Sequence, residues 1–413
     1  MKTQIQRIII ISLILCGVCT NRLFSQPTYK PLSDKDLERV SKLLLQERMS
    51  GLLSGSYLSL GAIDLGPLEQ TLSHNPIEGW RIKIGAGTNS SFSRRFALKG
   101  FLAYGTFDRK FKYGLSAAVS FKRKPSSVYA FPANCLTLSY KDNTTIPSCP
   151  DYDAFYNSMT ESSSYYLMYE QTANLTYLYE FPFALSVSPF VSCSRLYSSM
   201  YHHNSNIYET LSQPQNYIKT GAEVAFKPQR KRKNISSLNS MLYPLETYAG
   251  VMVFANIYPD YSDQNHTNAS FLLQERLFIG RRMAVDFRLK GGKIFGNSDN
   301  HYWFSPLFSN TIIASVYGMN LLTADNIFFR KEYMQTTLQL NFCGTILNSI
   351  PFLKQLKVNE FIYGKALFGT CEPYYEVGAG IDNIFSCLGV ELIRSFDMQQ
   401  QGGGMWGVKI RLK

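Results

Sequence analysis

Residues that could carry out covalent catalysis lie together at one place in the sequence. Of the five histidines, only His202 and His203 are adjacent, and Ser198 and Ser199 shortly precede them. A serine activated by a histidine is the minimum for nucleophilic attack on a lipid ester. No His-Glu-x-x-His, Gly-x-Ser-x-Gly or phosphate-binding motif supports this cluster. We therefore expect no enzyme and keep a membrane-embedded lipid hydrolase or acyltransferase as an alternative.

The cysteines offer one candidate disulfide and no metal site. The cysteines beyond an expected signal peptide are Cys135, Cys149, Cys193, Cys343, Cys371 and Cys387. Cys135 and Cys149 are predicted to share a long loop, and exported compartments can be oxidising, so this pair is the disulfide candidate. No Cys-x-x-Cys pair occurs among the six, which argues against zinc. We expect neither a metal nor a cofactor.

Basic residues outnumber acidic ones, and many alternate with apolar residues. The formal charge is +12, and removing Lys2, Arg7 and Arg22 with a signal peptide leaves +9. The strand pattern below directs the following cations inward: Arg81, Lys83, Lys99, Arg282, Arg288, Lys290, Lys365, Lys409 and Arg411. A cationic lumen would favour anionic solutes. The alternative is that these cations pair with inward acids such as Asp286 and Glu376.

The run Arg230–Lys233 resembles a nucleic-acid patch in isolation. An exported protein does not meet nucleic acid, so we expect a solvated loop.

The first residues indicate export. Lys2 and Arg7 precede an apolar run from Ile8 to Val18, and polar residues follow, as in a cleaved signal peptide. That run is shorter than the ~20 residues that a membrane-spanning helix needs. No later stretch of about 18 uncharged apolar residues occurs, so the mature chain has no predicted helical span. We expect residues 1–25 to be the signal peptide.

The rest of the chain alternates with period two, which is typical of β-strands. In residues 80–87, one face carries Trp80, Ile82, Ile84 and Ala86, and the other carries Arg81, Lys83, Gly85 and Gly87. Three further segments show the same alternation. Tyr (27) and Phe (28) are abundant, which suits the aromatic girdles of a membrane barrel. A bilayer admits only helices and closed barrels, because backbone polar groups must be satisfied internally. The alternative is a secreted soluble β-protein with its apolar face inward.

We predict a transmembrane antiparallel β-barrel of about 14 strands (12–16) over residues 57–413. The predicted strands are 78–89, 93–106, 111–123, 162–181, 185–199, 216–227, 242–258, 267–277, 281–294, 330–343, 358–370, 374–382, 388–396 and 404–413. An even number places both termini in the periplasm, together with the turns 108–110, 182–184 and 383–385. The segments 124–161 and 295–329 are then long outer loops. Residues 26–56 are predicted to be a periplasmic lead-in with a short amphipathic helix that begins at Ser33. The alternative is that this helix is a small plug of the barrel or binds a partner.

Several phrases resemble a known family. They are residues 75–87 (NPIEGWRIKIGAG), 92–106 (FSRRFALKGFLAYGT), 350–357 (IPFLKQLK) and 375–385 (YEVGAGIDNIF). The chain resembles Bacteroidota-type outer-membrane barrels of unsettled function, which usually follow a carboxypeptidase-regulatory-like domain that is absent here. Its C-terminal phrases are similar to those of surface-antigen barrels in assembly and translocation machines. The resemblance implies a role in envelope biogenesis or export, although this chain ends on Lys413 rather than on an aromatic residue.

The sequence therefore predicts a non-enzymatic outer-membrane barrel that serves transport or envelope biogenesis. A surface adhesin or structural barrel acting through its long outer loops is a further alternative. The expected partner is outer-membrane lipid, an envelope assembly or transport complex is a further candidate, and nucleic acid is excluded.

Overall fold

The computed structural model describes most of the chain beyond residue 56. The chain divides into two units, residues 1–50 and 51–413, and every described residue lies in the second. The described residues are 57–66, 71–75, 77–123, 127–145, 168–197, 214–228, 247–279, 283–298, 304, 314, 316, 318–322, 331–342, 344–351, 358–369, 373–384, 388–397 and 404–412. The predicted signal peptide and the predicted lead-in helix lie outside them.

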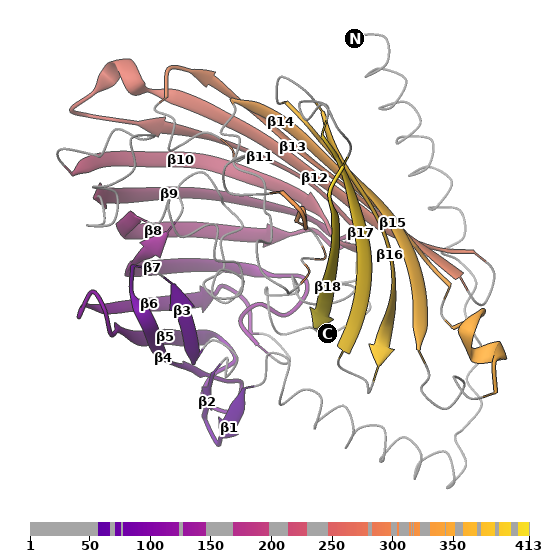
Figure 1. Cartoon of the computed structure of the whole chain (residues 1–413). Coiled ribbons are helices and arrows are strands. Elements are labelled where there is room, and N and C mark those ends of the chain that lie inside the picture. Colours follow the sequence, from indigo (N-terminus) through magenta and orange to yellow (C-terminus); the bar gives the residue numbers. More distant parts are fainter. Residues whose placement is uncertain are drawn as a thin grey trace, which may run out of the picture. The chain divides into compact units, whose positions relative to one another are not determined.

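The described fold is all-β and antiparallel, with eighteen strands in one curved sheet (Figure 1). The strands are β1 (Leu58–Leu60), β2 (Ile63–Leu65), β3 (Leu72–Asn75), β4 (Gly79–Thr88), β5 (Phe96–Gly105), β6 (Phe111–Ser120), β7 (Asn134–Thr145), β8 (Met168–Glu180), β9 (Leu185–Tyr197), β10 (Gln215–Phe226), β11 (Tyr248–Ile257), β12 (His266–Ile279), β13 (Met283–Gly296), β14 (Glu332–Asn341), β15 (Asn359–Phe368), β16 (Tyr374–Ile384), β17 (Leu388–Asp397) and β18 (Trp406–Leu412). The described helices are two short 3-10 turns, η6 (Ser262–Gln264) and η9 (Leu347–Ser349). No helix among the described residues is long and apolar enough to cross a membrane.

From β4 to β18, each strand pairs with the next one in sequence. At the start of the sheet, β2 and β3 both pair with β4, at its two ends, and β1 forms a short hairpin with β2. Because β2 and β3 follow each other along the same neighbour, they act as one interrupted strand. This arrangement keeps the alternation of side chains in step across the sheet.

The predicted count of about 14 strands is too low. Each of the fourteen predicted strands overlaps an observed one, and the sheet adds β7 and the short strands β1 to β3. Strand β7 lies within the segment 124–161, which the sequence predicts to be a loop. Its apolar alternation is confined to Leu136, Leu138 and Tyr140, and polar residues complete the strand. A strand with so short an apolar stretch is hard to separate from a loop by periodicity.

The additional strand β7 changes which connections share an end of the sheet. We call the end that carries Leu412 the C-terminal end; it also carries the connections 89–95, 121–133, 181–184, 227–247, 280–282, 342–358 and 385–387. We call the other end the long-loop end; it carries 76–78, 106–110, 146–167, 198–214, 258–265, 297–331, 369–373 and 398–405. The predicted grouping of the turn 108–110 with the turns 182–184 and 383–385 is therefore wrong, because the turn 108–110 lies at the opposite end from the other two.

The two faces of the sheet differ in the polarity and the burial of their side chains. On one side, which we call the apolar face, large apolar side chains are exposed; Ile84, Phe111 and Val408 are 65%, 64% and 63% exposed. On the other side, which we call the polar face, ionisable side chains are buried, including Arg81, Lys112 and Glu376. A soluble sheet would bury the apolar face and expose the charges.

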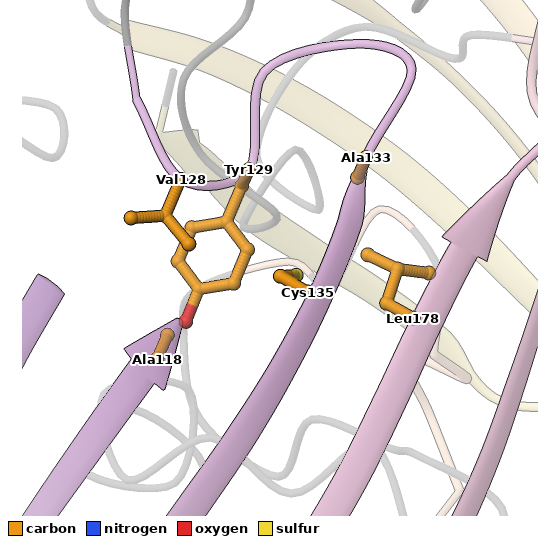
Figure 2. Packing of buried hydrophobic residues seen from close by; sticks show 6 residues of the cluster. All are labelled: Ala118, Val128, Tyr129, Ala133, Cys135 and Leu178. Carbon is orange, nitrogen blue, oxygen red and sulfur yellow. The ribbon is translucent and has the colours of Figure 1, made fainter. Parts of the chain in front are cut away.

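A connection at the C-terminal end folds against the polar face. Val128, Tyr129 and Ala133 of the connection 121–133 pack with Ala118 of β6, Cys135 of β7 and Leu178 of β8 (Figure 2). The Ala133 N–H donates to Oε2 of Glu180 at 2.8 Å, and the Glu180 N–H donates to the Ala133 carbonyl at 2.8 Å. The connection is therefore held by both apolar packing and hydrogen bonds.

Candidate functional site

A buried polar cluster on β15 to β18 holds a short segment of the connection 297–331. Glu376 of β16 and Glu391 of β17 are 0% exposed, and Lys365 and Arg411 are also buried. Against them lies the 318–322 segment (Gly318–Leu322), in which Met319, Asn320 and Leu322 are buried. A charged group without water must be paired or hydrogen-bonded, so the contacts of each carboxylate decide whether this cluster is stable.

Glu376 binds the backbone of the 318–322 segment. The Asn320 N–H donates to both carboxylate oxygens at 2.8 Å, and the Leu321 N–H donates to Oε1 at 2.6 Å. The Tyr374 hydroxyl donates to the same Oε1 at 2.9 Å. Two successive N–H groups aimed at one anion form a cradle of the kind that binds anions in many proteins. Here the anion is a side chain of the sheet itself.

Glu391 binds the side chain of Asn320. The Asn320 Nδ2 donates to Oε1 of Glu391 at 2.8 Å, and the Tyr363 hydroxyl donates to the same oxygen at 3.0 Å. Arg411 of β18 donates from Nη2 to the other carboxylate oxygen, Oε2, at 2.7 Å. Lys365 holds the start of the segment, because its Nζ donates to the Gly318 carbonyl at 2.7 Å. The segment is thus bound by side chains of three neighbouring strands, β15 to β17, and Arg411 of β18 holds Glu391 in place.

Two further features place the connection 297–331 against the last strand. The Ala314 N–H donates to the Ile410 carbonyl of β18 at 2.7 Å. A side chain at Gly407 would collide with Leu321, so the glycine leaves room for that residue. Similarly, a side chain at Gly378 would collide with the Tyr363 ring that reaches Glu391. The sheet is shaped to receive this segment as well as charged to bind it.

A second buried cluster lies on the polar face at the long-loop end. Glu78 accepts from Nη1 of Arg81 at 2.9 Å and forms an ion pair with Lys112 at 2.9 Å. Lys112 also pairs with Asp108, and Arg81 donates from Nη2 to the Asn143 Oδ1 at 2.7 Å. All the charges in this cluster are matched, so it ties β4, β6 and β7 together rather than offering a free charge to a ligand.

The structure places most of the predicted inward cations on the polar face. By register these are Arg81, Lys83, Lys99, Arg288, Lys290, Lys365, Lys409 and Arg411. Arg282 lies outside the described residues. Arg81 and Arg411 pair with carboxylates. Lys83 lies over the Phe101 ring at 4.8 Å and Lys99 over the Tyr129 ring at 5.4 Å. Of the expected acidic partners, Asp286 pairs with Arg276, which was not among the predicted cations.

The other predicted site residues lie largely outside the described part of the chain. Ser198, Ser199, His202 and His203 are among the undescribed residues, so the hydrolase cluster stays a prediction. Cys149 is also undescribed, and the disulfide with Cys135 stays a prediction. Cys135 itself is buried at the start of β7 rather than in a loop, and β7 lies between the two positions in sequence. No group of residues suited to a metal ion occurs within the described ranges.

Sequence reasoning missed Glu391, Asn320 and the 318–322 segment. The segment has no periodic pattern, and its partners lie 43 to 71 residues away along the chain. The one available signal was the occurrence of glutamate at inward positions of two neighbouring strands, because a buried acid needs a partner.

The comparisons with known proteins bear on the same region. Residues 189–381 match a family model. Its description is the C-terminal domain of a family of unknown function, DUF5686, and the match covers less than half of the chain. It includes Asn320 and Glu376 but ends before Glu391 and Arg411. No curated protein matches the sequence.

Among solved structures, the chain is similar to the crystal structure of BamA from Haemophilus ducreyi lacking POTRA domains 1–3. The identity is 10%, the match covers 94% of this chain and 79% of that chain, and the TM-score is 0.49.

Proposed function

We propose that this protein is an outer-membrane β-barrel with the apolar face toward lipid and the polar face toward the lumen. The exposed side chains Ile84, Phe111 and Val408 are a small part of an apolar surface that runs over the whole sheet. A soluble monomer rarely exposes apolar surface on this scale. Contact between this apolar surface and the hydrocarbon of the lipid is favourable, and the buried ion pairs lie on the opposite, polar face, away from the hydrocarbon.

The distribution of charge along the strands supports this orientation toward lipid. On the apolar face, Arg195, Lys293 and Arg394 all lie near the long-loop end of their strands. A cation costs about 2–4 kcal/mol at the bilayer midplane and about 0–1 kcal/mol near its surface. The placement therefore fits a bilayer with one of its surfaces near the long-loop end.

For the role of the barrel, we propose envelope biogenesis or export without enzymatic activity. The observation that carries this proposal is the 318–322 segment, which Glu376 and Glu391 bind on the polar face. An open pore has no need for a segment of its own chain bound inside it. A protein that passes cargo benefits from an internal segment that occupies the lumen at rest and can be displaced.

A simple anion channel is less well supported. Arg81, Lys112 and Arg411 are each neutralised by a carboxylate on the polar face. Paired cations contribute little attraction to a passing anion compared with a ring of free ones.

The membrane part of the proposal is tested by carbonate extraction and gel mobility of heated and unheated samples. We expect the protein to resist extraction and its unheated band to migrate faster. A protein that washes off without a mobility shift contradicts a membrane barrel.

The role is tested in planar bilayers and in cells. We expect the wild type to conduct weakly and Glu376→Gln to conduct more often, because the 318–322 segment is then held less firmly. Depletion in the native host should lower the amounts of other outer-membrane components. A large, steady conductance of the wild type that the substitution does not change would point to an open channel instead.

A further inference from the structure

Three hydrogen-bond donors lie close together on the apolar face near the long-loop end. They are Tyr375 of β16, Arg394 of β17 and Trp406 of β18, which come from three adjacent strands. Arg394 is registered with Trp406 on one side and with Val377 on the other, and Tyr375 is registered with Phe396. Tyr375 is therefore the diagonal neighbour of Arg394.

The Arg394 guanidinium is positioned by two aromatic rings. Its Cζ lies 5.1 Å from the centroid of the Phe396 ring and 5.1 Å from that of the Trp406 ring. Contact with aromatic rings is favourable for a guanidinium and fixes its orientation, but it does not satisfy the N–H groups. Phe396 and Trp406 are 40% and 59% exposed, so this site faces outward.

The donors of this group have no acceptors among the residues that the structure describes. Within the described residues, the Arg394 guanidinium has no hydrogen bond and no ion pair, and its Nε is buried without a partner. None of the outward-facing residues of β16, β17 and β18 is acidic. By contrast, Lys293 on the same face forms an ion pair with Glu332 at 2.8 Å. An outward-facing arginine whose guanidinium has no acceptor within the described part of the chain calls for an external anion.

We propose that Arg394, with Tyr375 and Trp406, binds the phosphate of a membrane lipid headgroup. This inference rests on the proposed membrane location. The guanidinium matches two phosphate oxygens at once, and a phenol and an indole N–H suit the interfacial region where headgroups lie. On the same face, Val377 lies beside Arg394 and Leu392 lies two residues further from the long-loop end; they are 54% and 49% exposed and would contact the acyl chains.

The test is native mass spectrometry of the full chain in detergent, titrated with dioleoyl phosphatidic acid. Dioleoylglycerol, which has the same acyl chains without phosphate, is the matched ligand control. We expect the wild type to retain phosphatidic acid in preference to dioleoylglycerol. Arg394→Gln should weaken that retention about five- to tenfold, because one interfacial cation and its bidentate contact are lost.

The matched protein control is Lys293→Gln, which removes an outward cation that already has a carboxylate partner. We expect it to retain phosphatidic acid as the wild type does. If Arg394→Gln does not fold, Arg394→Lys replaces it. The charge is then kept but the bidentate fork is lost, and we expect binding about two- to threefold weaker.

Equal retention of phosphatidic acid by wild type and the Arg394 variant overturns the inference, as does equal retention of the two lipids by the wild type. In either case the proteins still resist carbonate and shift on heating if the proposed location is right. Failure of the location itself gives a wild type that washes off membranes and retains neither lipid.

Discussion

At the scale of single residues, Glu376 has the largest share in holding the 318–322 segment. Its carboxylate accepts from two backbone N–H groups and one hydroxyl, with no exposure to solvent. Glu376→Gln removes the charge and replaces one acceptor by a donor, which then faces a backbone N–H. We expect the free energy of unfolding to fall by about 2–4 kcal/mol, measured by urea titration of the heat-sensitive gel mobility.

The control for this change is Glu332→Gln. Glu332 also pairs with a cation, Lys293, but both side chains are more than half exposed. An exposed pair contributes about 0–1 kcal/mol, so its urea midpoint should stay close to that of the wild type. Equal shifts for the two variants would mean that Glu376 has no special role.

The glycines of the same region permit a test that changes no charge. A Cβ at Gly378 would collide with the rigid Tyr363 ring, whose hydroxyl donates to Glu391. We expect Gly378→Ala to cost about 1–3 kcal/mol, because the ring must move away from its hydrogen bonds. The readouts are the urea midpoint and protease cleavage within the connection 297–331.

Gly364 of the neighbouring strand β15 is the matched control, because an added Cβ there meets no atom within 4 Å. Gly364→Ala should leave both readouts unchanged or slightly improve stability. A destabilisation as large as that of Gly378→Ala would point to strand propensity rather than to Tyr363.

Part of the site could be predicted from the sequence and part could not. Alternation placed Lys365 and Arg411 on one face, because a strand turns every second side chain to the same side. The same rule could not find Asn320, which lies in a connection without periodicity and meets Glu391 only through the tertiary fold.

At the scale of elements, the strand β7 and the connection before it depend on each other. Tyr129 is 9% exposed in the cluster with Ala118, Cys135 and Leu178. Tyr129→Ala would leave a cavity there, and we expect a loss of about 3–5 kcal/mol, the range for removal of a buried aromatic ring. The urea midpoint measures the loss, and Tyr129→Phe is the control because it keeps the ring.

The hydroxyl of Tyr129 adds a dependence on pH. Burial raises the pKa of Tyr129 above its usual value near 10, and the hydrogen bond to Thr137 opposes that rise. Since the unfolded chain then loses the proton first, stability should fall as the pH rises above about 10. In Tyr129→Phe this part of the fall should be absent; an identical alkaline profile for the two proteins would mean that Tyr129 is not buried in solution.

The elements themselves were predictable where the apolar alternation was long. All fourteen predicted strands overlap observed ones, whereas β7 was missed because only Leu136, Leu138 and Tyr140 mark it. The short strands β1 to β3 have three or four residues each, which is too few for a period to be recognised. Omitting one full strand placed the connections before β7, including the turn 108–110, at the wrong end relative to those after it.

At the scale of the whole molecule, the distribution of the connections between the two ends of the sheet predicts which end faces the outside of the cell. The connections 146–167, 198–214 and 297–331 share the long-loop end, and the C terminus shares its end with 227–247, which contains Arg230–Lys233. In membrane barrels the long loops are external and the short turns periplasmic. We expect a protease site inserted into 198–214 to be cut on intact cells, and one inserted into 227–247 to be cut only after permeabilisation.

The two insertions are equivalent in length and composition and differ only in the end of the sheet at which they lie, so each is the control for the other. The opposite pattern would mean that the C-terminal end faces outward, and Arg394 would then lie at the periplasmic surface. Cleavage of both sites on intact cells would mean that no membrane separates the two ends. The exposed apolar face would then have to be covered by another protein, because exposure of so large an apolar surface to water is unfavourable.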